Sequence, residues 1–294
     1  MSVAGAGFGR LMIFLAVLFQ AVGKVMFGTW LTAVPSHFFV FVSFTLTAVF
    51  FLLLSRRSVG QKAWGPIIPL NASTALTFLS FFYALKLIEP AIVGAVDIGI
   101  GPVLAVILTF VMTGERPSLI RAVVCIGVLA GCGILALAAV SGSGFASIGE
   151  NAWLGLAASV VAGVGAVLIT MASKALITRG WKFQSVLAHR FYLIIPISLV
   201  MTISTGLPAI EWSVYLVAAL LAVTVIGVLA PLYLLQVGIG RCDAYTVMVT
   251  MAALPVLTFI IEGFSPLYAW SWLTAVGIGV VTLFLLIDVI AKRS

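Results

Sequence analysis

The sequence predicts an all-α membrane protein in which ten transmembrane helices form two inverted five-helix repeats. Of its 294 residues, 63% are hydrophobic and only 8% are charged, and the mean hydropathy is +1.31. Soluble domains carry about 25% charged residues, so this shortage of charge indicates that most of the surface faces lipid. Two further observations support the prediction: the apolar residues form ten long runs, and the basic residues gather in alternate loops.

Prolines, glycines and charged residues separate the ten apolar runs. A helix needs about 20 predominantly apolar residues to cross the hydrocarbon core of a bilayer, and each run meets that length. We expect the spans at residues 9–31, 36–55, 65–87, 90–113, 118–140, 152–176, 184–204, 212–237, 243–262 and 267–290.

The loop charges predict the orientation of these spans. With the N-terminus inside, the inner segments hold most of the basic residues, namely Arg10, Arg56, Arg57, Lys62, Arg116, Arg121, Lys174, Arg179, Lys182, Arg190, Arg241, Lys292 and Arg293. Lys86 alone lies at an outer end. The outer loops instead carry the acidic residues Glu89, Glu150, Glu211 and Glu262. Because Lys and Arg accumulate in cytoplasmic loops, we expect both termini in the cytoplasm.

The chain divides into two halves of five spans each. Segment 83–102 resembles segment 233–255, since each has an aromatic residue at a helix end, a polar break and a span with an internal proline. Five is an odd number, so the halves have opposite orientations, as in the inverted repeats of many transporters. We place the first repeat at 1–143 and the second at 144–294, with the Gly- and Ser-rich stretch 141–149 at the junction.

The motifs and charge pattern argue against several classes of function. The net charge is +7, but the basic residues lie in short loops without interleaved aromatics, so we expect no nucleic-acid partner. Cys125 and Cys132 are about 10 Å apart along one helix, too far for a disulfide. The sequence has no GxSxG, HExxH, paired CxxC or phosphate-loop motif. We therefore expect no enzyme, no cofactor and no metal site; the expected partners are the lipid bilayer and a small-molecule substrate.

Small residues recur at four-residue spacing on the fifth and tenth spans, at Gly127 and Gly131 and at Ala275 and Gly279. Small residues let membrane helices approach closely. Two interpretations stay open, packing within the chain or a contact in a homodimer. Phe284, further along the tenth span, is expected to face lipid.

Few ionisable residues lie inside the spans. A charge at the bilayer centre costs about 3 kcal/mol on insertion scales, so such residues mark candidate functional sites. Gln20 and Lys24 lie one turn apart on the first span, and Asp97 lies at about the same depth in the fourth. The pattern predicts either a charge pair that lines a central cavity and meets a zwitterionic substrate, or a permanent ion pair that lets two helices pack. In the seventh span, Arg190 beside His189 either acts inside the bundle or extends to the inner interface.

Side chains suited to an apolar or aromatic substrate recur at helical spacing on three spans. On the third span they are Thr77, Phe78, Phe82 and Tyr83, and on the eighth and ninth they are Tyr233, Tyr245 and Met248. Such residues line binding cavities, but the same stripe also arises from core packing, and both interpretations stay open. Pro102 and Pro255 are expected to interrupt the fourth and ninth helices, as hinges or as static kinks.

Between the third and fifth spans, three features occur in order. They are Gly101-Pro102-Val103-Leu104 in the fourth span, the loop Gly114-Glu115-Arg116-Pro117-Ser118, and the glycine-rich run from Gly127 to Gly133. Together with the segment from Ala84-Leu85 to Pro90, this stretch resembles the EamA-type repeat of the drug/metabolite transporter superfamily. The second half departs from that pattern, because Glu262 follows Pro255 by only seven residues and no arginine comes next.

The resemblance implies ten helices, two inverted repeats and a central cavity walled chiefly by spans one, three, four, six, eight and nine. Bacterial members of the superfamily include YddG-like exporters of aromatic and other neutral amino acids. The resemblance therefore implies a secondary transporter in the bacterial inner (plasma) membrane that exports such amino acids by alternating access. One alternative is an exporter of cationic drugs or amines, for which Asp97 would be the binding carboxylate. Another is a non-transport membrane protein such as a flippase subunit.

The topology can be tested with reporters fused to the chain. A C-terminal reporter that is active only in the cytoplasm is expected to be active, because the loop charges place that end inside. The same reporter inserted after Glu211, in a predicted outer loop, is expected to be silent and serves as the control. A C-terminal fusion that is active only on the outer side would contradict this orientation.

Overall fold

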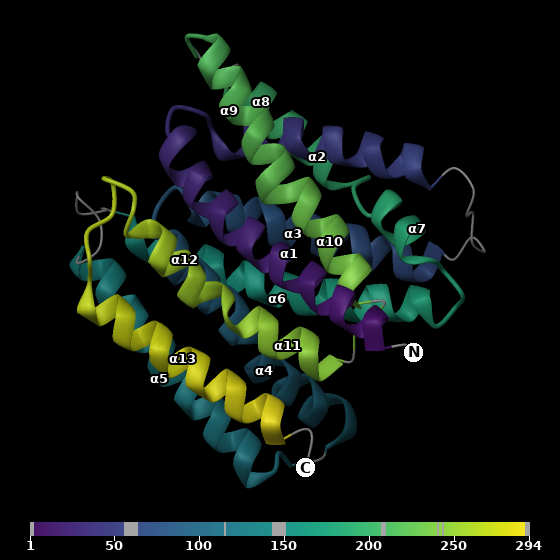
Figure 1. Ribbon diagram of the computed structural model, residues 1–294, viewed down its shortest axis with the longest axis vertical. Helices are drawn as coiled ribbons and strands as arrows, with labels where there is room; N and C mark the ends of the chain where they lie inside the picture. Colours follow the sequence, from purple (N-terminus) through teal and green to yellow (C-terminus); the bar gives the residue numbers. More distant parts are fainter. Residues whose placement is uncertain are drawn as a thin grey trace.

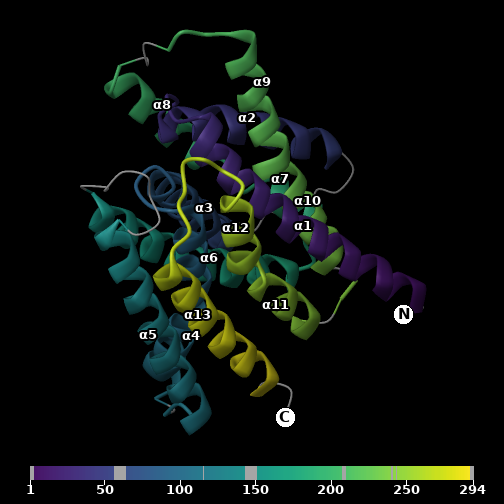
Figure 2. The ribbon, with the colours of Figure 1, turned by 60° about the vertical axis from the view of Figure 1, so that its left-hand side comes forward.

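The computed structural model describes residues 3–55, 64–114, 116–142, 151–206, 210–239, 241–242 and 244–291, and they form a bundle of helices (Figure 1). The first residues of α1 and the last residues of α13 lie at the same end of the bundle, as an even number of crossings requires (Figures 1 and 2).

Eight helical stretches in the described residues are long and apolar enough to cross a membrane. They belong to α1 (Val3–Trp30), α2 (Ser36–Leu54), α3 (Trp64–Ala84), α4 (Pro90–Thr113), α5 (Leu119–Ser141), α6 (Ala152–Ile177), the continuous run of α9 (Val214–Val223), η1 (Thr224–Leu229) and α10 (Ala230–Ile239), and α13 (Trp272–Ala291). Two shorter apolar stretches complete the set, at Ile194–Ser204 and Val249–Glu262. The prediction of an all-helical membrane protein is confirmed.

Two of the expected spans are broken helices. The seventh consists of α7 (Phe183–Ala188) and α8 (Ile194–Ser204), and the ninth consists of α11 (Ala244–Ala252) and α12 (Leu254–Glu262). The second break comes immediately before Pro255, which lies in the first turn of α12, where a proline needs no hydrogen-bond donor.

Pro102 behaves differently from Pro255. It lies inside α4, which continues on both sides of it, so the expected interruption of the fourth helix is not seen. A proline in a helix interior still leaves the carbonyl group four residues earlier without its usual partner, which here is that of Ile98. The hinge roles of both prolines stay predictions.

The helices pack in matched pairs across the two halves of the chain. α3 and α4 pack against α6, while η1, α10 and α12 pack against α1. α5 packs along α13, as both views show, and α2 packs against α8 and α4 against α12 (Figures 1 and 2). The contacts of α6 with α3 and α4 thus have counterparts, with the halves exchanged, in the contacts of α1 with η1, α10 and α12.

Glycines permit the closest of these crossings. A Cβ atom added to Gly23 of α1 would lie 2.2 Å from the Cα atom of Gly227 in η1. In the counterpart crossing, a Cβ atom added to Gly165 of α6 would lie 2.2 Å from the Oγ1 atom of Thr77 in α3. No side chain fits at either point, so the backbones are in direct contact there.

Side chains of the same chain occupy the space beside the small residues of α5. Gly127 lies against the ring of Phe284, and Gly131 lies against Val281, both on α13. This supports packing within the chain as the role of these glycines, and the homodimer stays a prediction without that support. Phe284 is partly buried in this contact, so the expectation that it faces lipid is wrong.

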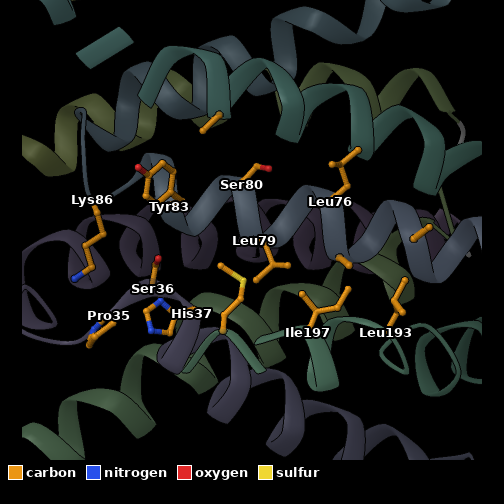
Figure 3. A pocket seen from close by; sticks show the side chains of 14 residues that line it. Pro35, Ser36, His37, Leu76, Leu79, Ser80, Tyr83, Lys86, Leu193 and Ile197 are labelled. Carbon is orange, nitrogen blue, oxygen red and sulfur yellow. The ribbon is translucent and has the colours of Figure 1, made fainter. Parts of the chain in front are cut away.

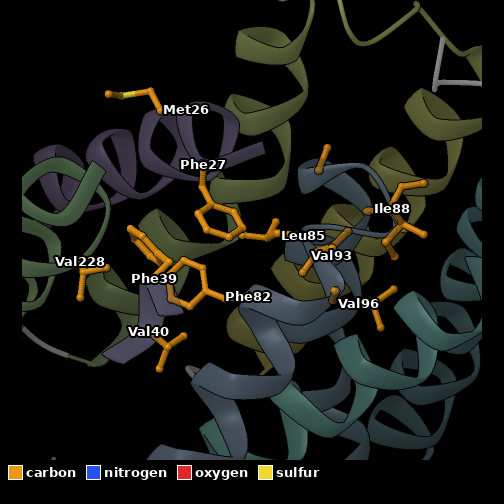
Figure 4. Packing of buried hydrophobic residues seen from close by; sticks show 14 of the residues in the cluster. Met26, Phe27, Phe39, Val40, Phe82, Leu85, Ile88, Val93, Val96 and Val228 are labelled. Atoms are coloured by element: carbon orange, nitrogen blue, oxygen red, sulfur yellow. The ribbon is translucent and has the colours of Figure 1, made fainter. Parts of the chain in front are cut away.

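Aromatic side chains form the centre of the core. The rings of Phe27, Phe39 and Phe82 meet pairwise with centroids 4.8, 5.0 and 4.9 Å apart (Figure 4). Phe44 extends this group to Phe78, with 4.7 Å between ring centroids. Each such pair contributes about 0.5–1.5 kcal/mol beyond the burial of its surface, so α1, α2 and α3 are held together at this point.

The Gly23 crossing generates a stability prediction. Gly23→Ala is expected to lower the free energy of unfolding by about 1–3 kcal/mol, because the added methyl group meets backbone that cannot rotate away. Gly133→Ala on α5 is the matched control, since a Cβ atom there meets nothing within 4 Å and alanine favours a helix. Thermal unfolding of the detergent-purified variants measures both effects, and equal midpoints would contradict the close contact.

Candidate functional site

Two buried cations approach the same face of α3. The Nζ atom of Lys24 lies 4.9 Å from the centroid of the Phe81 ring, and the guanidinium carbon of Arg190 lies 5.7 Å from those of Phe78 and Phe191. Phe78 and Phe81 are one turn apart on α3. Lys24 is 6% exposed and Arg190 is 5% exposed. Arg190 therefore acts inside the bundle, and the interpretation in which it extends to the interface is wrong.

Asp97 brings the opposite charge to this region. Lys24 lies against Gly94 of α4, where a Cβ atom would come within 2.8 Å of its Nζ atom, and Asp97 is one turn further along the same helix. The two side chains attract each other electrostatically. However, the Nζ atom of Lys24 and the Oδ1 atom of Asp97 are both buried without a hydrogen-bond partner. The expected charge pair is thus a longer-range interaction and not a hydrogen-bonded bridge.

We call Lys24, Asp97 and Arg190 the central charged cluster, because Lys24 and Asp97 attract each other and Arg190 is linked to them through Phe78 and Phe81, one turn apart on α3. The Nε atom of Arg190 is also buried without a hydrogen-bond partner, and the described residues place no carboxylate in an ion pair with it. Buried polar groups are nearly always satisfied in native proteins, and a buried ion without a partner is costly. The cluster therefore has unused binding capacity of both signs.

Asn71 supports the helix break that carries Arg190. Its side-chain amide donates to the carbonyl oxygen of His189 at 2.9 Å, and its Oδ1 atom accepts from the backbone N–H of Tyr192 at 2.8 Å. Backbone groups inside a membrane must be satisfied by protein, so Asn71 replaces hydrogen bonds that the broken helix lacks. Asn71 was not among the predicted site residues, although a polar amide within a span is a visible sequence signal.

A cavity of about 780 Å³ opens on a neighbouring face of α3, between α2, α3, α6 and α8. Its polar end is formed by Ser36, His37, Tyr83 and Lys86. Apolar side chains, including those of Leu76 and Leu193, line the opposite end (Figure 3). Pockets for small molecules have about this volume and this mixture of a large apolar wall with a few polar groups.

Lys86 is held at the rim of this cavity. Its ammonium group donates to the carbonyl oxygens of Leu31 and Thr32 and lies over the ring of Phe27. Burial lowers the pKa of Lys86 to about 8. The residue closes the end of α1 and connects the outer loop to the aromatic core.

The remaining candidate residues have different surroundings, and their roles in substrate binding stay predictions. Tyr83 lines the cavity and is 44% exposed, while Phe82 is buried in the aromatic core. Thr77 lies at the α3–α6 crossing. Gln20 is partly buried on α1, and Tyr233 is exposed on α10. The positions on α11 are Tyr245 and Met248, whose side chains lie outside the described residues.

Glu89 and Glu262 lie at the ends of spans, Glu89 in the loop before α4 and Glu262 at the last residue of α12. Their burial was not predicted, since each is only 3% exposed. No group of three or more His, Cys, Asp or Glu side chains in the described part of the chain is arranged to hold a metal ion.

The comparisons with known proteins agree with this architecture. The sequence model of the EamA-like transporter family matches residues 7–137. A known crystal structure of another protein superposes with a TM-score of 0.65 at 20% sequence identity, covering 97% of this chain and 97% of its own. At that identity the likeness shows a shared fold only. No curated protein sequence matches the chain.

The electrostatic link within the cluster can be measured with a double-mutant cycle. Lys24→Ala is expected to destabilise the protein because it leaves the Asp97 carboxylate without its nearest positive charge, and adding Asp97→Ala is expected to restore part of the loss. The coupling should be about 0.5–3 kcal/mol, as for other contacting residues. Combining Lys24→Ala with Glu211→Ala, an exposed position, is the control and should give additive effects. Additivity in both cycles would show that Lys24 and Asp97 are not coupled.

Proposed function

We propose that this protein is a transporter of the EamA-like family and that it exports neutral and aromatic amino acids across a bacterial inner membrane by alternating access. The observation that carries the proposal is the central charged cluster, in which buried groups of both signs lack hydrogen-bond partners. The family match supports secondary transport of a small metabolite. The cluster supports the narrower choice of a zwitterion.

An amino acid supplies the charges that the cluster can bind. Arg190 presents a planar donor that suits a carboxylate, and guanidinium–carboxylate pairs are often bidentate. Asp97 suits the substrate's ammonium group. Between them, the rings of Phe78 and Phe81 offer an apolar surface to the substrate side chain. A substrate with two phosphates is a poorer match, because Arg190 is the one arginine in this cluster.

The matched helix pairs support alternating access. If residues 1–143 and 144–294 are inverted repeats, contacts between the halves must occur in exchanged pairs, and the packing of α3 on α6 and of α1 on η1 and α10 has this pattern. The breaks in the seventh and ninth spans are also typical of transporters, whose substrate sites are built at interrupted helices. In this arrangement both termini are cytoplasmic.

An exporter of cationic amines is the second candidate. The Oδ1 atom of Asp97 has no hydrogen-bond partner, so this carboxylate is available to a cation. Lys24 and Arg190, both buried near the same face of α3, would repel such a substrate. We therefore prefer a zwitterionic substrate. Its carboxylate can pair with Arg190, which an amine substrate would leave unpaired.

Transport in proteoliposomes tests the choice. The wild-type protein is expected to exchange labelled L-phenylalanine, and Arg190→Gln is expected to reduce exchange by about 10–100-fold. That range corresponds to the roughly 1.5–3 kcal/mol of a hydrogen bond to a charged group. Arg179→Gln, an exposed position, is the matched control and should leave exchange unchanged. Movement of an organic cation such as tetraphenylphosphonium without movement of any amino acid would favour the amine exporter, and movement of neither would favour a non-transport protein.

A further inference from the structure

Glu89 and Glu262 meet at the outer ends of the spans. Glu89 immediately precedes α4, and Glu262 is the last residue of α12. The Oε1 atom of Glu262 accepts a hydrogen bond of 2.6 Å from the backbone N–H of Ala91, in the first turn of α4. The Oε2 atom of Glu89 accepts one of 3.2 Å from the Oγ1 atom of Thr274 on α13. The two carboxylates therefore tie the start of α4 to α12 and α13.

Ionising both Glu89 and Glu262 is unfavourable in free energy. Glu89 and Glu262 repel each other when both are ionised, and both are buried. When two carboxylates share a buried site, the first proton is held far more strongly than the second, and the two groups titrate as a unit. Burial raises the pKa of Glu89 to about 7.

Lys24 supplies the positive charge that acts on Glu262. Its Nζ atom lies against Gly94, one turn along α4 from the N–H group that binds Glu262, and it attracts both Glu262 and Asp97. It is 6% exposed and makes no hydrogen bond. Lys24 is thus a buried cation without a hydrogen-bond partner that attracts both Asp97 and Glu262.

The other ionisable groups around Glu262 do not neutralise the negative charge of Glu89 and Glu262. α12 packs against α1, α4, α11 and α13. The loop before α13 adds Tyr268, whose pKa is raised by burial, so it stays neutral. Asp288 lies about 21 Å from Thr274 along α13, and Lys86 is turned toward carbonyl groups at the end of α1. Glu262 and Asp97 therefore share one ammonium group, that of Lys24.

We propose that Glu89 and Glu262 form a proton-binding site that holds one proton between them, and that this proton is exchanged for the zwitterionic substrate. The exchange rests on the proposed function, while the proton site does not. When the substrate's ammonium group pairs with Asp97, Lys24 is released to Glu262. The carboxylate pair then carries two negative charges beside a full positive charge, and its proton leaves on the side from which the substrate came. Departure of the substrate to the opposite side returns Lys24 to Asp97, and the pair takes up a proton from that side.

Infrared titration without any substrate tests the proton site. The wild-type protein is expected to show a carboxylic-acid band that persists above the usual pH range of carboxyl groups and disappears as the pH is raised further. The band should be lost in the double variant Glu89→Gln/Glu262→Gln and kept in Glu211→Gln, an exposed carboxylate on the same side. Since the folded protein binds this proton more tightly than the unfolded chain, the wild-type unfolding temperature should also fall as the pH rises above the usual carboxyl pKa of about 4.5. A band that persists unchanged in the double variant would overturn the site.

Proton release on substrate binding tests the exchange. Adding L-phenylalanine to weakly buffered wild-type protein should release close to one proton per bound molecule, measured with a pH-sensitive dye, and the double variant should bind phenylalanine with no release. Binding without release from the wild type would overturn the exchange. If phenylalanine does not bind at all, the proposed function and the exchange fall together, and the infrared titration alone decides the proton site.

Discussion

The membrane interior offers no water to a polar group, and the organisation of this protein follows from that constraint. A backbone group or a charge at membrane depth must find its partner within the protein. Where α7 ends and α8 begins, the amide of Asn71 supplies the missing donor and acceptor from a different helix. These hydrogen bonds lower the free-energy cost of the break, and the break places Arg190 inside the bundle.

Aromatic rings provide the second kind of partner. Lys24, Lys86 and Arg190 each lie over the face of a phenylalanine ring. A cation over a ring gains about 0.5–2 kcal/mol, much less than a full ion pair in the same environment would supply. Such a cation is held in position but remains available to an anion. A substrate site needs this combination, because a cation already paired with a carboxylate would have to be freed before it could bind.

The sequence predicted the membrane class and most of the spans because hydropathy acts locally, residue by residue. It also placed Lys24 and Asp97 at one depth, since a helix advances by a fixed rise per residue. It did not predict that Glu89 and Glu262 are buried, because position along the chain shows that a residue ends a span but not that a neighbouring helix covers it. Phe284 was misjudged for a similar reason, since the glycine that receives its ring lies far away in the sequence. The break before α8 has a local signal, since Pro196 lies in the first turn of α8, but the support that Asn71 gives to this break comes from a residue remote in sequence.

Lys24 couples the two sites because one ammonium group cannot neutralise two carboxylates at once. It lies between Asp97 and Glu262 and attracts both. With an effective dielectric constant of about 20, an ion pair gains about 4 kcal/mol at 4 Å and about half as much at 8 Å. Moving the ammonium group by a few ångströms toward Glu262 therefore changes the proton-binding equilibrium of the outer pair about 30-fold.

The sign of the effect follows from the substrate's own charges. An arriving ammonium group displaces Lys24 from Asp97 and expels the proton, whereas an arriving carboxylate bound at Lys24 would draw it away from Glu262 and retain the proton. Because Arg190 is free to take the carboxylate, the first course is open, and inward movement of protons can then drive outward movement of substrate.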